Sequence, residues 1–172
     1  MDSNNDAQQF CELSIELLDQ SMVKIRHCLK QLSAEQLWWR PQRSLNSVGN
    51  LCLHLAGNLR QWGIVPFSEV ADNRDRESEF SSEIRISTVE VLQRLNDAVA
   101  ESKQIWNAME QKALRESVNI QGFDVTLKHA ISHTSSHFVG HTHQIIMLTR
   151  MQLGEGYRFQ WSADDDRDRV PI

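Results

Sequence analysis

Residues 124–153 read DVTLKHAISHTSSHFVGHTHQIIMLTRMQL, and this stretch decides the fold class. Apolar side chains recur along it at steps of three and four residues, the pattern of one buried face of a helix. The stretch contains no proline, and Gly154 directly after it is a natural helix stop. We therefore expect one long helix whose buried face carries Leu127, Ala130, Ile131, Thr134, Phe138, Ile145 and Leu148.

Three further segments show helical periodicity: residues 6–32, residues 46 or 47 to 63, and residues 87 or 88 to 109. Residues 33–36 (SAEQ) form a capping box that opens a short extra turn. The expected buried faces include Phe10, Leu13, Leu17, Met22, Ile25 and Leu29 in the first segment, Val48, Leu51, Leu55, Leu59 and Trp62 in the second, and Val89, Val91, Leu92, Leu95, Val99 and Ile105 in the third. Four helices in one domain predict an all-α four-helix bundle.

The connection between the second and third helices, residues 65–86, is charged and has no period. An extended chain covers about 3.3 Å per residue, so this connection can cross the length of a bundle. The second and third helices can then run parallel. Gly49 and Gly57 lie inside the second helix, where glycine lowers stability, which indicates close packing or a need for space.

A length of 172 residues suits a single domain, which we place at residues 1–172, with a helical core of about 6–154 and a tail of 155–172. The tail alternates Tyr157, Phe159 and Trp161 before it turns acidic, so we expect it to dock partly and then fray. A content of 40% hydrophobic and 24% charged residues is ordinary for a globular protein and argues against disorder.

The charge pattern and the cysteines indicate which kinds of partner and which cellular compartment to expect. The net charge of −5, with no Lys/Arg block, argues against a nucleic-acid partner. The polar N-terminal residues do not resemble a signal peptide, and no apolar run is long enough to span a membrane. Cys11, Cys28 and Cys52 lack CxxC spacing and are typical of reduced thiols. We expect a cytoplasmic protein.

The histidines are the unusual feature. The chain has seven, and one cluster holds His129, His133, His137, His141 and His143. Two histidines four residues apart on a helix can reach one ion, and neutral imidazoles suit Zn²⁺, Ni²⁺ or Fe²⁺. Each four-residue step turns about 40°, so the ladder from His129 to His141 turns about 120°, too far for all four to share an ion. His143 lies about 160° from His141 and should face elsewhere.

Packing selects among the pairs. His137 and His141 continue the inward face of their helix best, and His54 lies on the inward face of the second helix. Hydrogen-bonded core or surface histidines are the alternative interpretation of such pairs. Three inward imidazoles without partners would each be costly to bury, so we predict one divalent metal ion bound by His54, His137 and His141. Asn58 and Gln144 are candidates for contacts to these ligands or to a substrate, although capping and surface roles explain such residues equally well.

Residues 50–61 (NLCLHLAGNLRQ), together with His137-x-x-x-His141-x-x-Gln144-Ile145 and Trp39-Arg40-Pro41, resemble the DinB-like (YfiT-like) family of metalloenzymes. The resemblance covers about residues 8–153. It implies a four-helix bundle with a crossover between helices two and three, a three-histidine metal site at His54, His137 and His141, and frequently a homodimer. Thr142-His143 stands before Gln144 where the family often has glycine, which should affect the rim of the site more than its ligands.

These features favour a metal-dependent enzyme. Three protein ligands leave a coordination position open, and a thiol or water bound there loses its proton near neutral pH. Characterised relatives include thiol-dependent transferases and isomerases, so the resemblance implies a low-molecular-weight thiol as co-substrate and a small-molecule substrate. The alternatives are a non-catalytic, stress-related bundle that binds a metal or small molecule, a metal-dependent hydrolase, and a purely structural helical partner.

Overall fold

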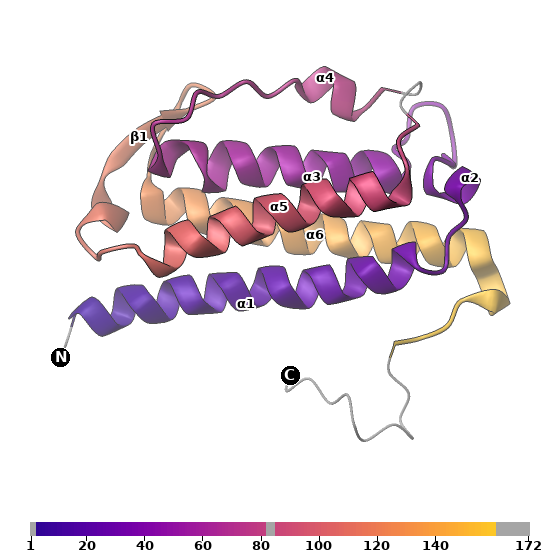
Figure 1. The fold of residues 1–172 in the computed structure, drawn as a ribbon, viewed down its shortest axis with the longest axis horizontal. Coiled ribbons are helices and arrows are strands. Elements are labelled where there is room, and N and C mark those ends of the chain that lie inside the picture. Colours follow the sequence, from indigo (N-terminus) through magenta and orange to yellow (C-terminus); the bar gives the residue numbers. More distant parts are fainter. Residues whose placement is uncertain (1–2, 82–84, 161–172) are drawn as a thin grey trace.

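Four long helices lie side by side in the computed structural model, which describes residues 3–81 and 85–160 (Figure 1). They are α1 (Ser3–Leu29), α3 (Val48–Gly63), α5 (Thr88–Asn107) and α6 (Leu127–Leu153). The expected all-α bundle is confirmed. None of the helices in the described residues is long and apolar enough to cross a membrane.

The connection between α3 and α5 crosses over the bundle. Figure 1 shows it returning along α3 to the end where α3 began, so that α3 and α5 run in the same direction. It contains a 3₁₀ turn, η1 (Val65–Phe67), and a short helix, α4 (Arg76–Glu79), which lies against α3. The sequence predicts the crossover but not α4.

Side-chain caps set the beginnings of the helices. Ser47 accepts a hydrogen bond from the backbone N–H of Asn50 at the start of α3, and Ser87 does so from Glu90 at the start of α5. Ser33 opens the short helix α2 (Ala34–Leu37) with the predicted capping box. At the other end of the bundle, Gly154 ends α6 with a φ of 53°, a left-handed conformation that glycine adopts without a steric penalty.

A β-hairpin precedes α6. Its strands, β1 (Ser117–Ile120) and β2 (Phe123–Thr126), pair antiparallel with Ile120 opposite Phe123. Gln121 and Gly122 both have positive φ, as the two central residues of a type I′ hairpin turn require. The expected helix start at residue 124 is therefore wrong, because Asp124 pairs with Asn119 and the helix begins only after Thr126 caps it.

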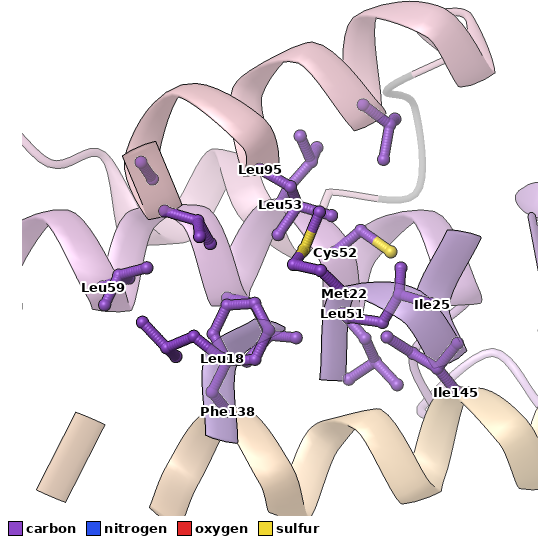
Figure 2. Packing of buried hydrophobic residues seen from close by; sticks show 14 of the residues in the cluster. Leu18, Met22, Ile25, Leu51, Cys52, Leu53, Leu59, Leu95, Phe138 and Ile145 are labelled. Atoms are coloured by element: carbon purple, nitrogen blue, oxygen red, sulfur yellow. The ribbon is translucent and has the colours of Figure 1, made fainter. Parts of the chain in front are cut away.

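The core lies where the four helices face one another. Figure 2 shows Leu18, Met22 and Ile25 of α1 close to Phe138 and Ile145 of α6. The expected buried faces of α3 and α6 are confirmed in full. The sequence pattern predicts that Leu13, Leu17 and Val89 are buried, and this is wrong, because they are 62%, 41% and 75% exposed.

The first residues of the tail dock at the C-terminal end of α1. The backbone N–H of Arg158 donates to Gln31 Oε1 at 2.7 Å, and the Arg158 carbonyl oxygen lies 2.6 Å from His27 Nε2. The Tyr157 ring packs against the core, whereas Phe159 is 66% exposed. Two further short 3₁₀ turns are η2 (Ala113–Arg115) and η3 (Gly154–Gly156). Trp161 and the acidic end of the tail lie outside the described residues.

Candidate metal centre

Three histidines from two helices converge between α3 and α6. His54 is buried in the middle of α3, and His137 and His141 are half-buried one turn apart on α6. One ring nitrogen from each lies within 4.8 Å of the others. The ring centroids are 5.0 Å apart for His54 with either partner and 4.4 Å apart for His137 with His141. This group could hold one metal ion.

The spacing of the donor atoms fits a shared ion. His54 Nε2 lies 2.9 Å from His137 Nε2. Two nitrogens bound to one ion at about 2.0–2.1 Å lie roughly 2.9–3.4 Å apart for bond angles between 90° and tetrahedral. Two of the rings can therefore accept an ion between them with little movement.

A buried hydrogen bond fixes the two helices beside the histidines. Thr134 Oγ1 donates to Asn58 Oδ1 at 2.9 Å, and both residues are buried. Asn58 lies one turn after His54 on α3, and Thr134 lies one turn before His137 on α6. The bond thus sets the register in which the histidines meet, and this is the contact that the structure shows for Asn58.

The Nδ1 atoms of two of the histidines have polar partners. His141 Nδ1 donates to Gln144 Oε1 at 2.8 Å. His54 Nδ1 lies 3.0 Å from Glu79 Oε2. A ring whose Nδ1–H is engaged presents the lone pair of Nε2, which is the arrangement of histidines that bind metals.

Glu79 is the last residue of α4 and forms an ion pair with the buried side chain of Arg74. Arg74 donates through Nε to Glu79 Oε1 at 2.7 Å and through Nη2 to Oε2 at 2.8 Å. Both side chains are less than a tenth exposed. Burial alone would raise the pKa of Glu79, but the hydrogen bonds and charges of Arg74 and His54 outweigh it and hold that pKa below its ordinary value. Glu79 is therefore an anion at neutral pH.

The network extends beyond this pair. Arg74 Nη1 donates to Gln61 Oε1 at 2.7 Å, and Gln61 Nε2 donates to Asp72 Oδ2 at 2.6 Å. At the other end of α4, Asn50 Nδ2 donates to the Glu79 carbonyl at 2.8 Å. The crossover is thus tied to α3 on both sides of His54.

Neither Arg74 nor Glu79 stands out in the sequence, because both lie in the charged stretch without a period. The available signal is Gly57. A Cβ at this position would overlap Glu79 Oε1 and crowd Arg74 Nε. The need for space inferred for Gly57 is therefore explained by the ion pair that rests on it. Gly49 leaves room in the same way for the Trp38 ring.

The lowered pKa values of His137 and His141 favour neutral imidazoles on α6. Burial, with smaller contributions from His141, His54, His133 and Arg74, lowers the pKa of His137 to about 3. Burial likewise lowers the pKa of His141, partly offset by its hydrogen bond to Gln144. Neutral rings are the form that binds a metal ion, so these two do not have to lose a proton first at neutral pH.

The other histidines of the cluster take different positions. The His133 ring stacks on the His137 ring with the centroids 5.8 Å apart, and it packs against the Trp62 ring with the centroids 4.2 Å apart. His133 thus forms an aromatic contact beside the site. His129 and His143 are exposed, and His143 thus faces away as its helical angle predicts. The converging group found in the described residues includes none of these three.

The comparisons with known proteins give a fold and a family. A chain described as "Crystal structure of the conserved protein of locus from Enterococcus faecalis" matches with a TM-score of 0.69 and 19% identity over 83% of this chain and 96% of that one, which shows a shared fold. A comparison with curated proteins finds no match. The model of one sequence family matches residues 5–162, nearly the whole chain. The chain belongs to this family, which is described as "Protein of unknown function (DUF1572)".

Proposed function

We propose that this protein is a metal-dependent enzyme that holds one divalent ion (Zn²⁺, Ni²⁺ or Fe²⁺) with His54, His137 and His141. The observation that carries the proposal is the convergence of three imidazoles, of which His141 has its Nδ1–H engaged by Gln144 and so presents Nε2. Structural zinc sites have four protein ligands, whereas catalytic sites have three and keep a position open. Three histidines fit the second kind.

The proposal also places the chain with DinB-like (YfiT-like) proteins. The motif residues that suggest this resemblance have roles around the site. Gln144 contacts His141, and Asn50 binds the backbone of the crossover at Glu79. Arg40 donates to Asn50 Oδ1 at 2.8 Å and to the carbonyls of Phe80 and Ser81 at 2.8 and 3.0 Å. The motif residues thus lie beside the three histidines or form the hydrogen bonds that hold the crossover against α3.

Thiol transfer suits the surroundings of the site better than hydrolysis. An ion held by the three histidines would lower the pKa of a small thiol. The thiol proton would pass to solvent, the sulfur would form a bond to an electrophilic carbon, and the leaving group would depart with its electron pair. Hydrolysis would gain from a free carboxylate to act as a base. The carboxylate in contact with His54 is Glu79, and Arg74 and His54 already engage it.

The protein's own cysteines do not suit the role of nucleophile. Cys11, Cys28 and Cys52 are all buried, and burial raises the pKa of each thiol. A thiolate is the reactive form, so these groups are held in the unreactive one. The nucleophile then comes from solution, as a low-molecular-weight thiol.

The test is turnover by the metal-loaded protein of a panel of small electrophiles, with and without glutathione, bacillithiol or mycothiol. We expect turnover that needs both the metal and the thiol. This turnover should persist in a Cys52→Ala variant. Turnover that survives removal of the metal contradicts it. If cobalt-substituted protein gives the same spectrum with and without thiol or azide, a non-catalytic metal-binding bundle replaces the enzyme.

The proposal includes a homodimer. The resemblance to DinB-like proteins suggests it, and the exposed Phe159 ring in the docked tail offers an apolar contact. Leu13 and Leu17 on α1 and Met147 and Met151 on α6 are large apolar side chains that are also exposed.

A further inference from the structure

His54 has two polar neighbours at the same ring nitrogen, and they make opposite demands on it. Nδ1 lies 3.0 Å from Glu79 Oε2 and 3.0 Å from Arg74 Nη2. An ionised carboxylate only accepts hydrogen bonds, and a guanidinium only donates them. Glu79 therefore favours a proton on Nδ1, whereas Arg74 favours a lone pair there.

The choice decides whether His54 can bind a metal. A neutral imidazole carries one proton, on Nδ1 or on Nε2. With the proton on Nδ1, Nε2 has a free lone pair directed at His137 Nε2, 2.9 Å away. With the proton on Nε2, that nitrogen has no lone pair to offer, and His54 cannot bind an ion through it.

The geometry favours Glu79. Arg74 already has other acceptors at shorter distances, namely Glu79 Oε1 at 2.7 Å, Glu79 Oε2 at 2.8 Å and Gln61 Oε1 at 2.7 Å. Its contact with His54 is the longest of the four. The Phe80 ring also lies beside the His54 ring, with the ring centroids 4.7 Å apart.

We propose that Glu79 is a positioning residue: it accepts the Nδ1–H of His54 and thereby presents Nε2 to the metal ion. Arg74 holds the carboxylate in place and keeps it charged. The crossover, and not only α3 and α6, is then part of the metal centre. This inference rests on the proposed function, since it assigns a role at the same site.

The first test needs no metal. The ¹⁵N shifts of the imidazole of His54 in metal-free protein report which nitrogen carries the proton. The wild type is expected to show Nδ1–H. In Glu79→Ala, Arg74 is the remaining neighbour of Nδ1 and can only donate, so the proton is expected to move to Nε2. Glu77→Ala, on the exposed side of the same short helix, is the matched control and should keep Nδ1–H.

The second test is affinity for Zn²⁺. Loss of the carboxylate behind a ligating histidine typically weakens metal binding about 10–100-fold, and we expect that loss for Glu79→Ala with none for Glu77→Ala. If Glu79→Ala does not fold, the wild-type tautomer still decides. A wild-type His54 with its proton on Nε2 overturns the inference, as does an unchanged tautomer in folded Glu79→Ala.

The outcomes separate the inference from the function on which it rests. Wild-type protein that binds no metal would refute the proposed metal site, while the tautomer in metal-free protein would still show whether Glu79 positions His54. Wild-type protein that binds Zn²⁺ with the same affinity as Glu79→Ala would refute the role of Glu79 and leave the three-histidine site standing.

Discussion

At the residue scale, Gly57 shows how a single missing side chain shapes the site. Its surface on α3 is covered by the carboxylate of Glu79 and by Arg74. Any Cβ there would push the ion pair away from His54. Gly140 on α6 is its natural comparison, because a Cβ at that position would meet nothing within 4 Å.

Gly57→Ala should therefore destabilise the fold, while Gly140→Ala should stabilise it. Overpacking costs about 1–3 kcal/mol, against a gain of roughly 1 kcal/mol from the better helix propensity of alanine. Gly140→Ala has only the gain. Urea unfolding of both variants measures the difference, and equal stabilities would show that the ion pair does not rest on Gly57.

A second residue-scale prediction contrasts two arginines. Arg74→Ala leaves Glu79 buried without its main partner, which costs about 3–5 kcal/mol in comparable cases. Arg60 pairs with Glu101 at 3.1 Å with both side chains about two-fifths exposed, and such pairs contribute about 0–1 kcal/mol. The free energy of unfolding should thus fall much further in Arg74→Ala than in Arg60→Ala. Similar losses would mean that solvent reaches Glu79 and relieves its charge.

At the element scale, periodicity and caps predict the parts of the site that lie on long helices. The buried face of α6 follows from three- and four-residue spacing, and that face selects His137 and His141 from the ladder. Ser47 fixes where α3 begins, so the direction of His54 follows as well. These features are local, and local pattern is what a sequence displays.

The parts that escape prediction depend on tertiary contacts. Glu79 and Arg74 lie in a segment without periodicity and gain their place only by docking on α3. Leu13 and Leu17 were expected inside, but α1 packs mainly on α5 and α6, which cover the face through Cys11, Leu18 and Met22. The hairpin before α6 is short enough that its alternation is not distinctive, although Gln121-Gly122 marks its turn.

In the whole molecule, the crossover couples metal binding at the three histidines to the stability of the bundle. Asn50, Arg40 and Gln61 tie it to the start and end of α3, and His54 lies between these ties. An ion that binds the folded protein but not the unfolded chain stabilises it by mass action. Loading with Zn²⁺ should therefore raise the melting temperature of the wild type, and the increase should vanish in His54→Ala. An equal increase in both proteins would place the ion elsewhere.

The homodimer is also a prediction about the whole molecule. Light scattering or sedimentation at micromolar concentration should give twice the mass of one chain, because the exposed apolar side chains of α1, α6 and the tail would be covered by a second copy. A Phe159→Ser variant tests whether the tail contributes. A wild-type mass equal to that of one chain contradicts the dimer.

Binding of one ion by His54, His137 and His141 is tested by the metal content of protein expressed without an affinity tag. The wild type should carry about one divalent ion per chain, and His54→Ala, His137→Ala and His141→Ala should each lose it. His143→Ala should keep it, because that side chain is exposed on another face of α6. A His143→Ala variant without metal beside a His137→Ala variant that retains its metal would show that these three histidines are not the ligands.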